Sequence, residues 1–150
     1  MDVLDRIERE IAIDAPAARV WKLVSEPGWY INDERIVTHR IERRGDFDVV
    51  HDPDHGAFAF ATVELDEPRY AAFRWFTDVE APDGASTLVE FRIEEISPTS
   101  VVLRVTESGF ASLPEGAAER RSRYDDHVGG WRIEMALAKS HVEEAVDAVG

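Results

Sequence analysis

The chain contains no cysteine, so disulfide bridges, thiolate metal ligands and a cysteine nucleophile are all excluded. Its N-terminal stretch lacks an apolar segment preceded by positive charge, and no apolar run approaches the roughly 20 residues that cross a bilayer. Lysine is scarce too, because Lys22 and Lys139 are its only occurrences and the other basic residues are arginine. We therefore expect a soluble, unexported, cytoplasmic protein that has no membrane partner.

Acidic residues outnumber basic ones by 31 to 17, which gives a formal net charge of −14 at pH 7. A surface of that sign repels phosphate backbones, so nucleic acid is not an expected partner. A chain of 150 residues matches one ordinary domain and buries about 68 to 70% of its unfolded surface. With no internal repeat or linker in view, residues 1–150 are predicted to form a single domain.

Alternating apolar residues predict a series of strands separated by turns. In residues 6–13 the side chains of Ile7, Ile11 and Ile13 share one face of an extended strand. Asp14 is then expected to cap a short helix. Further strands are predicted at 35–43, 47–51, 57–65, 70–79, 87–96 and 100–107, divided by Gly, Pro, Asp or Ser clusters. Short turns between successive strands favour an antiparallel sheet with one covered face.

The C-terminal segment is the only one long enough to cover that face. Ser112 and Glu115 are spaced like a capping box, and a helix on the order of 50 Å long is expected from there to about residue 149. Its apolar row is Tyr124, Val128, Trp131, Met135, Ala138, Val142, Ala145 and Val149. Gly129 and Gly130 interrupt the row, although each costs roughly 1 kcal/mol against alanine in a helix interior. Either the helix backbone approaches the sheet closely there, or a gap is left beneath it.

Three stretches carry a resemblance to a known family: REIAIDAPAARVW at 9–21, VELDEPRYAAFRW at 63–75, and Gly130-Trp131 followed by Leu137. Together they resemble the START-like superfamily, also called SRPBCC or Bet v 1-like, and within it the branch related to the activator of Hsp90 ATPase. The resemblance implies an α+β helix-grip fold, with a curved antiparallel sheet of about six to seven strands wrapped around a long C-terminal helix. One or two short helices would follow the first strand.

The resemblance also implies a cavity between sheet and helix, which in many relatives holds an apolar or amphipathic small molecule. Gly129 and Gly130 would leave room at its wall, and Trp131 would line it. The segment between Val24 and Glu34 is shorter than the entrance region of larger lipid-transfer relatives, which argues against a bulky sterol or phospholipid. The activator itself carries a separate N-terminal domain that contributes to chaperone binding, and one domain of 150 residues leaves no space for it.

Aromatic side chains are the main candidates for lining the cavity, because ligand pockets are concave and mostly apolar with a few placed polar groups. The candidate ligand-binding residues are Trp21, Trp29, Trp75, Phe91, Glu107, Phe110, Tyr124, Trp131 and Met135. The alternative for each aromatic residue is that it simply fills the core.

Glu107, Tyr124 and His127 are the candidate catalytic residues. Glu107 continues the inward alternation of the last strand, so it would need a hydrogen-bonding partner there. Alternatively the strand ends at Thr106 and Glu107 is solvated in the following turn. Tyr124 and His127 are three residues apart and therefore neighbours on the helix surface. A histidine beside a cavity could shuttle protons, and the alternative is a half-exposed helix residue.

No metal ion or other cofactor is expected. His51 and His55 are the first and last residues of the run HDPDH, which contains residue types that can bind a metal. However, Asp-Pro and His-Gly favour a hairpin turn, and no third histidine lies nearby. The chain also lacks the glycine patterns of nucleotide sites and the G-x-S-x-G elbow of serine hydrolases.

Three hypotheses of function follow. The first is a non-enzymatic protein that binds a small apolar or aromatic molecule in the cavity, as a carrier, a sensor or a stress-response protein. The second is an enzyme that resembles polyketide cyclases and dehydratases and uses the same cavity. The third is a protein-interaction module of cochaperone type that contacts a chaperone. A homodimer is compatible with each of them, and the sequence does not decide the oligomeric state.

Overall fold

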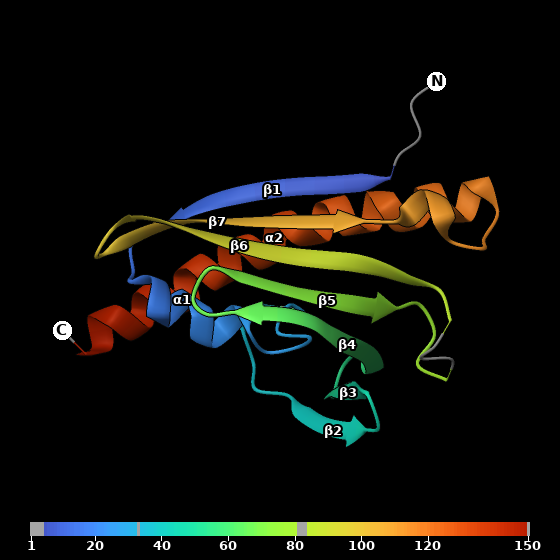
Figure 1. Cartoon of the computed structure of the whole chain (residues 1–150), viewed down its shortest axis with the longest axis horizontal. Helices are drawn as coiled ribbons and strands as arrows, with labels where there is room; N and C mark the ends of the chain where they lie inside the picture. The colour runs from blue at the N-terminus through green and yellow to red at the C-terminus, as the bar shows by residue number, and fades with distance from the viewer. Residues whose placement is uncertain (1–4, 33, 81–83, 150) are drawn as a thin grey trace.

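A computed structural model of the chain describes residues 5–32, 34–80 and 84–149, without the side chains of 145–149. The elements are β1 Arg6–Ile13, α1 Ala17–Val24, β2 Arg40–Arg44, β3 Phe47–Asp52, β4 Gly56–Asp66, β5 Tyr70–Phe76, β6 Ser86–Ser97, β7 Ser100–Ser108, the 3₁₀ turn η1 Phe110–Ser112 and α2 Ala117–Val149. The strands form one antiparallel sheet in the order β1-β7-β6-β5-β4-β3-β2, with α2 running along it (Figure 1).

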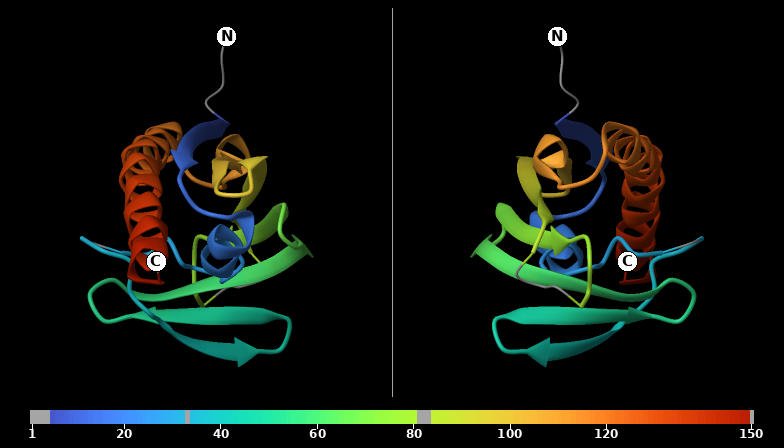
Figure 2. Two further views of the ribbon diagram at one scale, coloured as in Figure 1. Left: turned by 90° about the vertical axis from the view of Figure 1, so that its left-hand side faces the viewer. Right: turned by 90° about the vertical axis from the view of Figure 1, so that its right-hand side faces the viewer.

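The sheet curves around the two helices, which lie on its concave side (Figure 2). Strand β6 shows the reason in its sequence, because Val89, Phe91 and Ile93 are buried while the residues between them are half-buried or exposed. This architecture confirms the predicted α+β helix-grip fold with seven strands and a long C-terminal helix.

The side of α2 nearest β1 is tied to that edge strand by hydrogen bonds to its backbone. The Tyr124 hydroxyl donates to the Arg6 carbonyl oxygen at 3.0 Å, and Lys139 Nζ donates to the Ala12 carbonyl oxygen at 3.0 Å. At the end of the strand the Asp14 amide donates to Glu143 Oε2 at 2.8 Å. Helix α2 therefore covers an edge that would otherwise present unpaired backbone groups.

Several predicted boundaries are wrong. The strand expected at 70–79 ends at Phe76, because the chain bends at Thr77 toward β6. The strand expected at 35–43 begins only at Arg40, since the Val37 amide donates to Asn32 Oδ1 and His39 is buried against Asp52. The cap of α1 is Pro16, without a side-chain hydrogen bond. Asp14 lies two residues too early to cap the helix, and its amide donates to Glu143 of α2.

The expected capping box at Ser112 and Glu115 does not start α2. Residues 110–112 form the 3₁₀ turn instead, and Glu115 pairs with Arg123 of the helix, which begins at Ala117. Of the predicted apolar row, Trp131, Met135, Ala138 and Val142 are buried, and Tyr124 and Val128 are partly buried. The side chains of Ala145 and Val149 lie outside the described residues.

The centre of the layer between sheet and helices is filled by aromatic rings. Tyr30 lies in the middle of this cluster, with ring centroids 4.8 Å from Trp131, 5.2 Å from Trp75 and 5.7 Å from Phe91. Trp29 and Phe60 are also almost completely buried. The expectation of a hollow interior is therefore corrected, because large rings occupy the volume and leave smaller, open pockets at its rim.

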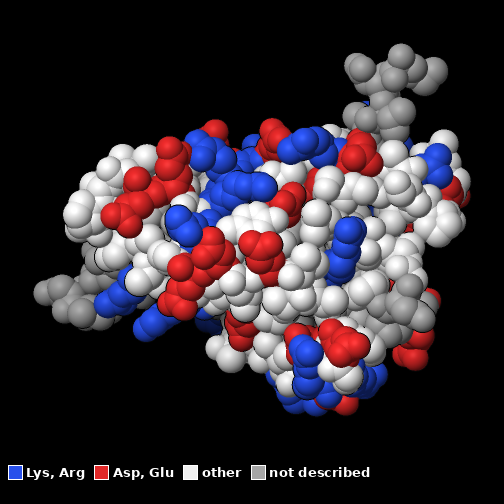
Figure 3. Space-filling view, viewed as in Figure 1, with Lys and Arg blue, Asp and Glu red and all other residues white. Residues whose placement is uncertain are grey.

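None of the described helices is both long and apolar enough to span a membrane. On the face of the molecule seen in Figure 1, acidic and basic side chains are interspersed (Figure 3). Arg104 illustrates this, since it pairs with Glu94 at 2.8 Å across neighbouring strands. Such exposed pairs contribute little stability each, which leaves the aromatic core as the main stabilising feature.

Candidate functional site

A buried carboxyl group lies where β7, β6 and α2 meet. Glu107 stands near the end of β7 and is 0% exposed. Its Oε2 accepts a hydrogen bond from Thr87 Oγ1 at 2.6 Å, and its Oε1 accepts one from Trp131 Nε1 at 2.8 Å. The same Oε1 lies 2.8 Å from His127 Nδ1. The structure thus decides the alternative left open by the sequence, because Glu107 faces inward and has three partners.

His127 connects this carboxyl group to the molecular surface. Its ring stacks on Trp75 with centroids 4.8 Å apart and 20° between the planes, and it meets Phe110 edge-on at 5.4 Å. An ionised carboxylate only accepts hydrogen bonds, so beside it the Nδ1 of His127 carries a proton and donates. In the neutral ring that tautomer leaves Nε2 as an acceptor, which suits the transfer of a proton.

Two small pockets share the stacked Trp75 and His127 rings among their lining residues. The first, which we call the Tyr30 pocket, has a volume of about 110 Å³ and is lined by Tyr30, Trp75, Asp126, His127, Gly130, Trp131 and Glu134. The second, the Arg123 pocket, has a volume of about 140 Å³ and is lined by Phe58, Trp75, Phe76, Thr77, Thr87, Arg123 and His127. Each is close to the roughly 150 Å³ of an engineered cavity that holds benzene, so each has room for about one small ring or head group.

The two adjacent glycines of α2 have open space in front of them. A Cβ atom built at Gly129 or at Gly130 would meet nothing within 4 Å. Close approach of the helix to the sheet is therefore not the reason for these glycines. Gly130 borders the Tyr30 pocket, while Gly129 is not among its lining residues. Of the two alternatives from the sequence, the gap fits the structure at Gly130.

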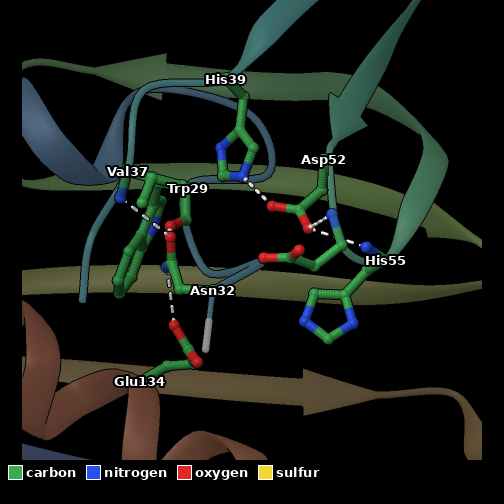
Figure 4. A network of polar contacts seen from close by, with 8 residues as sticks. Trp29, Asn32, Val37, His39, Asp52, His55 and Glu134 are labelled. Atoms are coloured by element: carbon green, nitrogen blue, oxygen red, sulfur yellow. Dashed lines mark hydrogen bonds and ion pairs between the residues drawn. The ribbon is translucent and has the colours of Figure 1, made fainter. Parts of the chain in front are cut away.

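Tyr30 is held in the pocket wall by the chain segment around it. Asn32 Nδ2 donates to the Trp29 carbonyl oxygen at 2.6 Å and to Glu134 Oε1 at 2.8 Å, while Asn32 Oδ1 accepts from the Val37 amide at 3.1 Å (Figure 4). This single amide side chain fastens the segment that follows α1 to helix α2, and so positions the Tyr30 ring.

The Tyr30 hydroxyl is buried without a hydrogen-bonding partner among the described residues. Burial, and to a smaller extent the nearby Glu107 carboxylate, raise the pKa of Tyr30 well above its ordinary value. The side chain is therefore a neutral phenol at physiological pH. A buried hydroxyl without a hydrogen-bonding partner is costly for stability.

The structure assembles part of the predicted site. Glu107, His127, Trp75 and Trp131 come together as described above. Trp29 and Phe91 lie in the ring cluster behind Tyr30, and Phe110 packs on His127. Trp21 and Met135 are buried in the core and are not among the described lining residues of either pocket. Tyr124 packs its ring against Phe110, and its hydroxyl binds the Arg6 carbonyl oxygen.

Several lining residues of the two pockets were not predicted, namely Tyr30, Phe58, Phe76, Thr77, Thr87, Arg123, Asp126 and Glu134. Some of them had a usable signal, because Asp126, Gly130 and Glu134 follow one another at intervals of four residues on the predicted helix. Thr87 precedes the inward residue Val89 by two positions on β6 and so shares its face. Tyr30 lies in an irregular segment, where periodicity gives no indication of direction.

The HDPDH run forms the predicted turn, with one unpredicted role. Asp52 Oδ1 lies 2.9 Å from His39 Nε2, and Asp52 Oδ2 accepts from the amides of Asp54 and His55 at 3.0 and 2.8 Å (Figure 4). Burial acts to raise the pKa of Asp52, but the hydrogen bonds from His39 and the two amides outweigh it and lower that pKa. Among the described residues no group of three or more potential ligands could hold a metal ion.

The chain is similar to one family model and to several solved structures. A family model described as Activator of Hsp90 ATPase homolog 1-like protein matches residues 14–139. No curated protein matches the chain. A solved aromatase/cyclase, Zhui from Streptomyces sp. R1128, is 20% identical, with 97% of each chain covered and a TM-score of 0.64. The Aha1 dimer from Colwellia psychrerythraea is 16% identical, with 92% of this chain and 96% of that chain covered and a TM-score of 0.61. A protein from Nitrosomonas europaea is 13% identical, with 99% of each chain covered and a TM-score of 0.66.

Proposed function

Because the chain belongs to the Activator of Hsp90 ATPase homolog 1-like family, whose model matches most of its length, we propose that it binds a small aromatic or apolar molecule beside helix α2. The observation that carries this proposal is the stacked pair of Trp75 and His127, which lines two open pockets. Both pockets expose ring surfaces, and aromatic faces are the surfaces on which flat ligands stack.

The size of the pockets limits the ligand. Together they offer space for a molecule of one or two rings, well below the roughly 300 to 1,000 Å³ of pockets that take drug-sized ligands. A sterol or an acyl chain would have to displace buried rings such as Trp29 or Phe91, and each of these contributes a large apolar area to the core. A single-ring ligand needs no such rearrangement.

The binding proposal is tested with a panel of neutral compounds of one or two aromatic rings, measured by isothermal titration calorimetry and thermal shift. Binding to the wild type is expected to be lost in Gly130→Leu, because the new side chain enters the open space of the Tyr30 pocket. Gly129→Leu is the matched control, since the same change there is outside that pocket. No binding by any compound, or equal binding by both variants and the wild type, would overturn the proposal.

A second function, acid and base catalysis, is favoured by the pair of His127 and Glu107. Glu107 Oε1 lies 2.8 Å from His127 Nδ1 and orients the imidazole ring, and the ring lines both pockets, where it can exchange a proton with a bound molecule. An aromatase/cyclase is among the proteins of similar fold. The test is to incubate the protein with a short poly-β-ketone mimic that closes to a single ring, and to follow the cyclised product by mass spectrometry. Product is expected from the wild type and not from His127→Gln, and its absence from both would reject the idea.

A chaperone contact and a homodimer stay predictions. One protein of similar fold was solved as an Aha1 dimer. Light scattering after size-exclusion chromatography measures the oligomeric state, and stimulation of a chaperone ATPase by added protein measures the contact.

A further inference from the structure

The Tyr30 pocket has acidic groups in its wall but no lysine or arginine among its described lining residues. Asp126, Gly130 and Glu134 are spaced by four residues, so they follow one another along one stripe of α2. One carboxyl group therefore stands about a turn before the glycine gap and the other about a turn after it. The rings of Tyr30 and Trp131 form the inner part of the same pocket.

We propose that the Tyr30 pocket accepts a small organic cation, in the form of an alkylated ammonium group. This inference rests on the binding function proposed above and names the chemistry of its ligand. A cation near the faces of tryptophan and tyrosine rings is attracted by the negative charge of those faces, and an alkylated nitrogen is also apolar enough to leave water readily. The two carboxyl groups among the lining residues add a charge of the opposite sign.

The geometry of the rings suits such a guest. Tyr30 lies with its centroid 4.8 Å from Trp131 and 5.2 Å from Trp75, with interplanar angles of 51° and 62°. At these distances the rings touch one another, so together they form one continuous aromatic wall against which a small head group can rest. The pocket volume of about 110 Å³ is also on the scale of a single small head group.

One carboxyl group of the wall is already fixed in place. Asn32 Nδ2 holds Glu134 Oε1 at 2.8 Å, so this carboxyl group needs little ordering when a ligand arrives. The Tyr30 ring is held as well, because it packs against Trp131 and Trp75. The charge and the aromatic wall are therefore both positioned before a cation binds.

The neighbouring Arg123 pocket gives an internal contrast. It shares Trp75 and His127 but contains Arg123, which pairs with Glu115, and no carboxyl group is among its described lining residues. An organic cation has no favourable charge there. The preference for a cation is thus expected in the Tyr30 pocket only.

The test compares choline with 3,3-dimethylbutan-1-ol, a neutral molecule of nearly the same shape, by calorimetry and tryptophan fluorescence at low salt. Choline is expected to bind the wild type at least about tenfold more tightly than the alcohol, which corresponds to about 1.4 kcal/mol. Asp126→Asn and Glu134→Gln should each reduce that ratio. Asp125→Asn, which removes the same charge from an exposed neighbour paired with Arg121, should leave it unchanged. Added salt should weaken choline binding and not that of the alcohol.

The outcomes separate this inference from the binding function itself. Equal affinity for choline and the alcohol, or binding of neutral aromatic compounds without choline, would overturn the cation preference and leave the pocket as a binding site. Failure of choline, the alcohol and the aromatic panel together would overturn both. If Glu134→Gln unfolds the protein, the exposed Asp126 and its control Asp125 still decide the question. Co-sedimentation with phosphatidylcholine vesicles would identify a lipid head group as the source of the cation, and binding of free choline alone would identify a soluble compound.

Discussion

Replacement of Glu107 by alanine is expected to destabilise the protein, whereas replacement by glutamine is expected to leave it folded and nearly as stable. In the alanine variant the Thr87 hydroxyl and the Trp131 indole N–H lose their acceptor, and both side chains are buried. Each buried donor left without a partner costs about 1 to 3 kcal/mol. Relief of the desolvation of the carboxyl group offsets part of that, so the net loss is about 2 to 4 kcal/mol.

Glutamine preserves the hydrogen bonds for a geometric reason. Its carbonyl oxygen can take the place of Glu107 Oε1 and accept from Trp131 and His127, while its NH₂ group donates to the Thr87 oxygen. We expect a loss below about 1 kcal/mol for this variant. The measurement is urea denaturation followed by tryptophan fluorescence and circular dichroism together. Equal stability of the alanine variant and the wild type would refute the reasoning, because it would mean that the three contacts contribute nothing.

Three further predictions concern single side chains. Tyr30→Phe should raise the free energy of unfolding of the unliganded protein by about 1 kcal/mol, because it removes a buried hydroxyl that has no partner; a loss of stability on urea denaturation would contradict this. Gly129→Ala should raise it by about 0.5 to 1 kcal/mol in the same assay, since a Cβ there meets nothing and alanine favours the helix; no gain would count against the open space. Burial acts to raise the pKa of Asp52, but the hydrogen bonds from His39 and two amides lower it below the ordinary value of 3.8. The ionised Asp52 therefore stabilises the fold fully above pH 3.8, and this contribution is lost as the pH falls through the folded-state pKa. Urea titrations across that acid range should therefore show a shallower decline for Asp52→Asn than for the wild type.

The sequence predicted the fold well because strands and helices leave a periodic record. The runs at 6–13, 87–96 and 100–107 match β1, β6 and β7 within one residue at each end, since apolar side chains alternate there toward a covered face. Boundaries failed where a tertiary contact replaced a local one. Asp14 is a residue type that often caps helices. In the folded chain its amide donates to Glu143, a contact between distant residues that the local sequence does not predict.

The candidate site was predicted only in part, because its formation depends on packing between distant elements. Glu107 could be placed on the inner face by alternation, but its burial depended on where β7 ends. Whether rings line a cavity or fill it depends on how Tyr30, Trp75 and Trp131 meet across 101 residues of sequence, from 30 to 131, which no periodicity encodes. The gap at Gly130 was one of the two alternatives predicted from the sequence, because glycine destabilises a helix interior and so indicates a position where a side chain would be unfavourable.

A small guest is proposed to bind against Trp75 and Trp131 beside Gly130, and indole N–H resonances test this most directly. The protein has four tryptophans, of which Trp75 and Trp131 line the Tyr30 pocket while Trp21 and Trp29 are not among its described lining residues. Titration of ¹⁵N-labelled protein with the strongest binder of the aromatic panel should move the Trp75 and Trp131 signals in a saturable way and leave that of Trp21 in place. The same titration of Gly130→Leu should move neither signal. Four unmoved resonances in the wild type, or equal shifts in the wild type and Gly130→Leu, would contradict the account.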